Sequence, residues 1–242
     1  MLLFAGGSGV LIGTVGVGGV LLAPAMVVFT GMDPHAATAT STWAFLFTGM
    51  VGTVVYARRG TVLWSAVLGL SVGCIPAAFV GARVNALLPS GVVLATLATL
   101  AMLVGGQQLW PRRDRIVRRP PTGWRLVTLG AAVGFGSALT GTGGPVLLVP
   151  TLLGLGVAPL GAIAISQAIQ IPVVAAASVG YLNAGLTDVR LGNMLGLAAA
   201  FGVVAGAAVA RRLPQERLRQ VVALACVLAG LLLLARSASA FG

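Results

Sequence analysis

Residues 13–24 read GTVGVGGVLLAP, and residues 141–150 read GTGGPVLLVP. Each stretch sets a cluster of glycines inside a long apolar run and follows it with an aliphatic turn and a proline. Glycine adopts backbone conformations that other residues avoid, so such a cluster interrupts a helix. The two stretches therefore predict two broken helices, one in each half of the chain.

Composition indicates that the solvent of this protein is lipid. The 242 residues are 58% hydrophobic and 8% charged, and the mean hydropathy is +1.04. One soluble core could not bury so much apolar surface. The apolar runs are long and do not alternate with polar residues, which favours helices over a membrane β-barrel. We therefore expect an all-α, polytopic membrane protein and not a soluble enzyme.

Polar residues divide the chain into eight apolar segments. They lie near residues 2–31, 35–57, 62–83, 90–110, 124–156, 160–182, 190–210 and 217–236. The polar stretch PRRDRIVRRPPT at 111–122 separates the first four segments from the last four. We expect a first membrane repeat at 1–110, a cytoplasmic linker rich in arginine and proline at 111–123, and a second membrane repeat at 124–242.

The second half aligns with the first at an offset of 125 residues. Aligned pairs include Gly16 with Gly141, Gly18 with Gly143, Gly19 with Gly144, Ser41 with Ser166, Tyr56 with Tyr181, Gly81 with Gly206 and Gly105 with Gly230. One offset across the whole unit indicates an internal duplication. Duplicated and interrupted membrane segments are typical of secondary transporters, whose substrate sites form where the broken helices meet.

Arginine is the only strongly basic residue, and the formal net charge is +11. The arginines lie between apolar runs, as cytoplasmic anchors do, so we expect no nucleic-acid binding. If the segments at 2–31 and 124–156 both span the membrane, the repeats run parallel. If both are re-entrant hairpins, the repeats are inverted, and Arg83, Arg190 and Arg236 alone lie outside. The positive-inside rule favours the arrangement that leaves fewer arginines outside, so we expect inverted repeats with both termini outside. We expect the protein in the cell inner membrane.

The two breaks are the predicted anion site. A helix that resumes after a break, here at Val20 and Pro145, exposes backbone N–H groups and the positive end of its dipole. Uncharged polar side chains near the starts of 35–57 and 160–182 would suit an anion with several oxygens. The expected substrate-binding residues are Gly16, Gly18, Gly19, Thr40, Ser41, Gly141, Gly143, Gly144, Ser166, Gln167 and Gln170. The alternatives are that the glycines serve close packing and that the hydroxyls bond to their own helices.

Other polar residues have structural explanations. Asp33 is the expected N-cap of the helix that contains His35, and proton handling by these two residues is the alternative. Cys74 and Cys226 are expected to pack in the apolar interior, since neither has a metal or redox spacing. The expected interface anchors are Tyr56, Trp64, Trp110, Trp124 and Tyr181. The single histidine, with no nucleophile or acid at a recognisable spacing, does not indicate an enzyme, a metal site or a cofactor.

Both halves resemble one family of membrane carriers. GTVGVGGVLLAP is followed by HAATATST at 35–42 and YARRG at 56–60, and GTGGPVLLVP is followed by AISQ at 164–167. This combination resembles the sulfite exporter TauE/SafE family over residues 13–110 and 130–235. The resemblance implies a carrier that moves sulfite, sulfonates or related small organic and sulfur-containing anions, usually outward. Val17 interrupts the first glycine triplet and Gln167 replaces Thr42, so the half-sites are not equivalent.

The sequence and the resemblance together predict a secondary membrane transporter that exports a small anion bound near mid-membrane between the breaks. The alternative is a passive anion channel or a non-transport membrane assembly partner. The coupling ion, proton or sodium, is not identified, because no acidic residue lies deep inside an apolar run. The sequence leaves a homodimer open.

Overall fold

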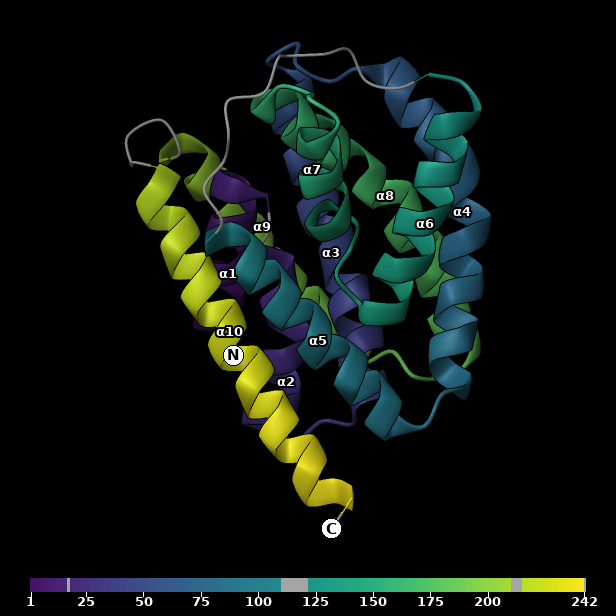
Figure 1. Cartoon of the computed structure of the whole chain (residues 1–242), viewed down its shortest axis with the longest axis vertical. Helices are drawn as coiled ribbons and strands as arrows, with labels where there is room; N and C mark the ends of the chain where they lie inside the picture. The colour runs from purple at the N-terminus through teal and green to yellow at the C-terminus, as the bar shows by residue number, and fades with distance from the viewer. Residues whose placement is uncertain (17, 110–121, 210–214, 242) are drawn as a thin grey trace.

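The computed structural model describes residues 1–16, 18–109, 122–209 and 215–241 (Figure 1). The described residues form α1 (Leu2–Val15), the 3-10 helix η1 (Gly18–Leu21), α2 (Leu22–Thr30), α3 (Pro34–Ala57), α4 (Trp64–Leu87), α5 (Ser90–Leu109), α6 (Trp124–Thr140), α7 (Pro145–Gly154), α8 (Pro159–Asn183), α9 (Val189–Val209) and α10 (Gln215–Phe241). The expected all-α architecture is confirmed. The predicted linker at 111–123 falls almost wholly outside the described residues.

Each glycine cluster ends one helix and turns the chain back along it. In the first hairpin, α1–η1–α2, the Ser8 hydroxyl donates to the carbonyl of Gly18 across 2.7 Å. In the second hairpin, α6–α7, a Cβ atom placed on Gly136 would lie 2.9 Å from the Leu147 side chain. The two predicted helix breaks are confirmed. α7 begins at Pro145 as expected, but the first hairpin resumes at Gly18, as a 3-10 turn, and not at Val20.

The hairpins are exchanged between the two halves of the chain. α1 packs against α9, and a Cβ atom on Gly9 would lie 2.0 Å from the carbonyl oxygen of Ala199. α6 packs against α4, where a Cβ atom on Gly134 would lie 2.6 Å from the carbonyl oxygen of Cys74. The two contacts are equivalent at the 125-residue offset, because Gly9 aligns with Gly134 and Cys74 aligns with Ala199. Each hairpin therefore docks on a helix of the other half.

The remaining helices pair with their own counterparts. On α5, a Cβ atom placed on Gly105 would lie 2.7 Å from Val227 of α10, and one on Gly230 of α10 would lie 2.6 Å from Met102. The partner on α10 moves backward as the position on α5 moves forward, so the two helices are antiparallel, as Figure 1 shows. Such a reciprocal pair is the arrangement around a local twofold axis.

The outer surface of the bundle is apolar. α4, α8, most of α9 and residues 90–107 of α5 are long and apolar enough to cross a membrane. α3 is as long as α4 but falls outside this set, because its first half is rich in threonine and serine. Large apolar side chains such as Phe201 and Leu224 are more than 70% exposed. Length, composition and surface together fit a multi-pass membrane protein.

The prediction that Tyr56 and Tyr181 anchor the membrane interface is wrong, because both side chains are buried. The Tyr56 hydroxyl donates to the carbonyl of Gly13 at 3.4 Å, and the Tyr181 hydroxyl donates to the carbonyl of Ala138. Both carbonyls belong to the last turn of a broken helix, where the helix itself supplies no donor. Trp64 and Trp124, by contrast, are 52% and 71% exposed, as anchors should be; Trp110 lies outside the described residues.

Tyr181→Phe should therefore lower stability. The change leaves the buried Ala138 carbonyl without its donor, which costs about 1–3 kcal/mol. Tyr56→Phe is the matched control and should cost less, because the hydrogen bond it removes is already long. Thermal unfolding of the two purified variants in one detergent checks the order. Equal losses of stability would contradict the conclusion that Tyr181 makes the stronger hydrogen bond.

Candidate functional site

The backbone of the first break depends on the conformation of Gly16 and on the packing of Gly18 against α1. Gly16 ends α1 with φ of 79°, in the left-handed region that favours glycine. A Cβ atom on Gly18 would lie 2.3 Å from the carbonyl oxygen of Ser8, so this residue packs inside the hairpin. Gly16 instead faces the other half, where Ile163 of α8 lies 3.5 Å from its Cβ position. Of the three glycines, Gly18 supports the turn and Gly16 contacts α8.

The second break follows the same plan with more distorted backbone. Gly141 ends α6 with φ of 62°, and Gly144 is the N-cap of α7 with φ of 106°. Pro145 follows as the first residue of α7, a position where its missing N–H costs nothing. Only glycine takes up these angles without strain, which accounts for the GTGGP pattern.

The two breaks meet beside one aromatic ring. A Cβ atom on Gly19 would lie 3.1 Å from the carbonyl oxygen of Thr142. The ring of Phe45 on α3 is 3.3 Å from that same Cβ position and 3.0 Å from the one on Gly143. Phe45 is fully buried. The expected meeting of the two breaks is therefore present, with Phe45 packed against both of them.

Polar side chains of α8 lie one helical turn from the contact of this helix with the first break, and they lack partners. Ile163 touches Gly16, and Ser166 and Gln167 follow one helical turn later. Both are fully buried, and neither the Ser166 hydroxyl nor either amide atom of Gln167 has a hydrogen-bond partner. Gln167 packs against α3, with its Oε1 atom 2.4 Å from the Cβ position of Gly52. Buried polar atoms are almost always paired in folded proteins, so this group is exceptional.

The side chain of Gln170 has partners for one of its two amide atoms and links α8 to α3 where the two helices cross. Its Nε2 donates to the Phe45 carbonyl at 3.1 Å and to the Thr48 hydroxyl at 2.9 Å, while its Oε1 has no partner. Phe45 and Gln170 are counterparts at the 125-residue offset. The crossing of the two helices therefore joins positions that are equivalent at this offset.

The polar groups of α3 beside the second break are satisfied. The Ser41 hydroxyl reaches the Thr38 carbonyl at 3.0 Å and the Gly141 carbonyl at 3.2 Å. Thr42 bonds to its own helix, at the carbonyl of Thr38. Thr40 lies apart from the breaks, since its hydroxyl accepts from the backbone N–H of Asp188, before α9. Ser41 and its counterpart Ser166 thus differ: one is paired and the other is not.

Three residues at the site were not among the predicted ones. Phe45 is an aromatic residue in an apolar helix, and its alignment with Gln170 was the one available signal. Thr142 contributes a backbone carbonyl, which carries no sequence signature. Asn85 of α4 is fully buried and donates from Nδ2 to the Leu139 carbonyl at 2.7 Å, next to the second break.

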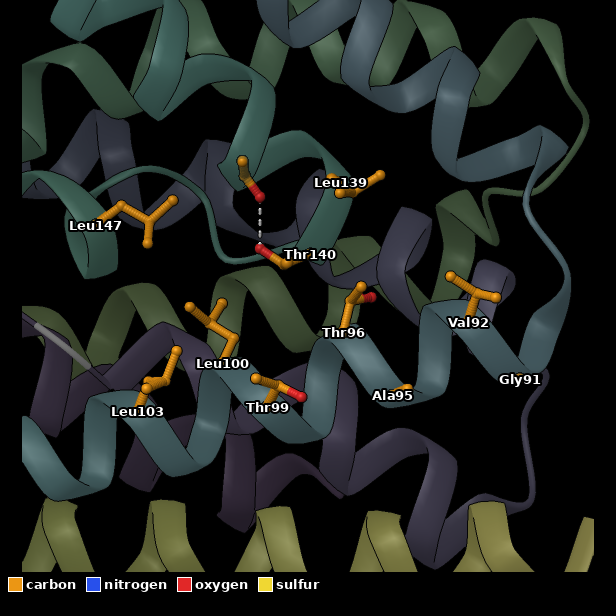
Figure 2. A pocket seen from close by; sticks show the side chains of 11 residues that line it. Gly91, Val92, Ala95, Thr96, Thr99, Leu100, Leu103, Leu139, Thr140 and Leu147 are labelled. Carbon is orange, nitrogen blue, oxygen red and sulfur yellow. Dashed lines mark hydrogen bonds between the residues drawn. The ribbon is translucent and has the colours of Figure 1, made fainter.

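A cavity of about 530 Å³ lies on the outer side of the second hairpin. Figure 2 shows α5 facing α6 and α7 across it, with Thr96 and Thr99 opposite Leu139 and Thr140. The lining is otherwise apolar. The Thr140 hydroxyl donates to Gly136 and lies 3.2 Å from the Thr142 hydroxyl. The cavity is therefore too apolar to be the anion site, but it leaves the hairpin unpacked on that side.

Comparison with known proteins agrees with these observations. Residues 1–233 match the family described as Sulfite exporter TauE/SafE. The chain is also 30% identical, over 148 residues, to a protein of Sinorhizobium fredii named "Probable membrane transporter protein y4hK". That alignment covers 59% of this chain and 58% of the relative. No solved structure matches. The match over nearly the whole chain shows that this protein belongs to the sulfite exporter TauE/SafE family of membrane transporters.

Proposed function

We propose that the protein is a secondary carrier that exports a small anion across the cell inner membrane. Sulfite or a related sulfur-containing or organic anion, such as a sulfonate or carboxylate, is the substrate that the family description favours. The observation that supports this most is the unpaired polar group of Ser166 and Gln167, buried beside the first break. A buried polar group left unpaired costs about 1–3 kcal/mol, and a bound anion with several oxygens would remove this cost for the Ser166 O–H and the Gln167 N–H₂ donors.

The chemistry around the breaks suits an anion better than a cation. Ser166 and Gln167 offer an O–H and an N–H₂ group as donors. η1 and α7 both start at the breaks, and helix starts attract negative charge. The described parts of η1, α2, α7 and α8 contain no acidic side chain that would repel an anion. A positive dipole and uncharged donors together favour an oxyanion over a metal ion.

The exchanged hairpins support alternating access by relative movement of the two halves. Each hairpin docks on a helix of the other half, so a shift between the halves displaces both breaks together. The cavity beside α5 gives the second hairpin room to move without unpacking a core. Each break has an unpaired buried hydroxyl nearby, Ser137 in the last turn of α6 and Ser166 on α8, so we infer that the two breaks take turns in holding the anion.

The antiparallel pairs support the inverted arrangement of repeats 1–110 and 124–242. We infer that both termini lie outside and that Arg58 and Arg59 lie in the cytoplasm. Cysteines placed singly at Gly60 and at Leu2, in a Cys74→Ala, Cys226→Ala background, should react with a membrane-impermeant maleimide from opposite sides. Reaction of both from the same side would exclude this topology.

The transport assay is uptake of radiolabelled sulfite into sealed proteoliposomes at alkaline pH, where passive entry of sulfur dioxide is minimal. We expect saturable uptake that at least one of thiosulfate, sulfate and small sulfonates inhibits. Liposomes without protein serve as the control for leakage. Uptake that stays linear with concentration and ignores every competitor would argue against a carrier of these anions.

A further inference from the structure

The only histidine of the chain is buried and linked to the second break. His35 lies in the first turn of α3 and is 9% exposed. Its Nδ1 lies 3.2 Å from Oδ1 of Asn85, whose Nδ2 donates to the carbonyl of Leu139 at 2.7 Å. Leu139 belongs to the last turn of α6, two residues before Gly141. A chain of two hydrogen bonds therefore runs from an ionisable ring to the break.

The hydrogen bonds fix which ring nitrogen can take up a proton. If the Asn85 amide were reversed, its oxygen would face the Leu139 carbonyl, and two acceptors would meet without a hydrogen. Oδ1 of Asn85 therefore faces His35, and Nδ1 carries the hydrogen that it donates. The neutral ring then has its lone pair on Nε2. A proton that binds there creates a cation without breaking either link of the chain.

The link exists at one break only. At the 125-residue offset, the counterpart of His35 is Leu160 and the counterpart of Asn85 is Ala210. Neither residue can bind a proton or pass on a hydrogen bond from its side chain. Both halves share the fold, so the fold does not require the link from His35 to Leu139. The link is present at the second break alone.

The neighbouring carboxylate is already committed to another role. Asp33 is the predicted N-cap, now confirmed: its Oδ1 accepts from the backbone N–H groups of His35 and Ala36, and its Oδ2 accepts from Ser90 of α5. His35 remains as the titratable group next to the break.

Other charges near the start of α3 lie on α4 and α9. Arg83 of α4 stacks over the ring of Phe79, 5.4 Å from its centroid. Before α9, Asp188 accepts from the N–H of Leu191, and Arg190 follows in the first turn. The described parts of α2 and α8 carry no charged side chain, and Arg125 is at the opposite end of α6. His35 is thus the titratable group that is connected to the break itself.

Protonation of His35 would attract an anion to the second break. Thr38 follows His35 by three residues, about 4.5 Å along the axis, and its methyl group is 2.7 Å from the Cβ position of Gly141. Opposite charges at this range attract strongly where water is excluded. We propose that His35 is the proton-binding site of the carrier, so that a proton on Nε2 and an anion at the second break stabilise each other and move together. This inference rests on the proposed transport function, and export by such coupling requires an outward gradient of the anion that exceeds the inward gradient of protons.

The test uses an anion that cannot itself carry a proton. Methanesulfonate, or thiosulfate if the sulfonate is not carried, stays fully ionised at the pH values used. With wild-type protein, a gradient of one pH unit that is acidic outside should concentrate the anion inside proteoliposomes about tenfold for one proton per monovalent anion. His35→Asn keeps an N–H donor for Asn85 but binds no proton. It should exchange labelled for unlabelled anion yet show no accumulation driven by the pH gradient. Accumulation equal to wild type would overturn the proposal.

A second measurement does not depend on transport. Because the chain has a single histidine, histidine-selective isotope labelling gives one imidazole signal. We expect a saturating anion to shift that signal toward its protonated position at constant pH, because the bound anion favours the charged ring. A ring that stays neutral until the protein unfolds would overturn the proton site. If no version of the protein moved any anion but the ring titrated, the transport function would fail and the proton site would stand.

Discussion

Gln167→Met should make the protein more stable and abolish most of its transport. Methionine has nearly the volume of glutamine and lacks the two amide atoms that have no partner beside the first break. Removing an unpaired buried amide should add about 1–3 kcal/mol to the free energy of unfolding. The same change removes a donor to the anion, which should raise KM about 10- to 100-fold if that hydrogen bond contributes 1.5–3 kcal/mol.

The matched control is Gln170→Met, one helical turn further along α8. The Nε2 atom of Gln170 makes two hydrogen bonds, to Phe45 and Thr48, so this variant should lose stability. Thermal unfolding and initial uptake rates are measured on both variants and on wild type. A stability loss in Gln167→Met as large as that in Gln170→Met would mean that Gln167 is a structural residue and not a binding residue.

Gly9→Val should prevent the protein from folding. A Cβ atom at this position would lie 2.0 Å from the carbonyl oxygen of Ala199 and 2.8 Å from its Cα, and neither backbone atom can move aside. Overpacking typically costs about 1–3 kcal/mol, and more where, as here, backbone atoms block the added group, a large share of the stability of a typical protein. We expect little monodisperse protein after detergent extraction.

Gly7→Val provides the comparison for that experiment. Gly7 lies on the same helix, is exposed, and has no atom within 4 Å of its Cβ position. Both changes alter helix propensity equally, so the difference between them reports the contact of α1 with α9. Equal yields of folded protein from the two variants would contradict the exchange of hairpins between the halves.

The sequence predicted the helices well because apolar length and glycine clusters are local signals. The eight segments correspond to the observed helices and hairpins, and the break before Pro145 was placed correctly. The start of the first resumed helix was misplaced, because the sequence does not distinguish a 3-10 turn at Gly18 from a loop. Tyr56 and Tyr181 were misassigned because an aromatic near a segment end fits an interface anchor as well as a carbonyl donor.

The site was less predictable than the fold, because it depends on which helix of one half packs against which helix of the other half. The offset of 125 residues shows that Ser41 and Ser166 are equivalent, but not that one is paired and the other unpaired. It also does not reveal that α1 docks on α9 and not on α4. Thr40 was grouped with Ser41 by proximity in sequence, yet neighbouring residues on a helix face different partners. The link from His35 through Asn85 to Leu139 joins three helices and has no sequence pattern.

Counterflow tests the central claim of a carrier most directly. Proteoliposomes are loaded with a high concentration of unlabelled anion and diluted into a trace of labelled anion on the outside. A carrier whose site is reached from one side at a time should concentrate the label inside transiently, above its final level, and Gln167→Met, with its higher KM, should show a smaller overshoot. A wild-type time course that rises steadily to equilibrium, without overshoot at any loading concentration, would contradict the account.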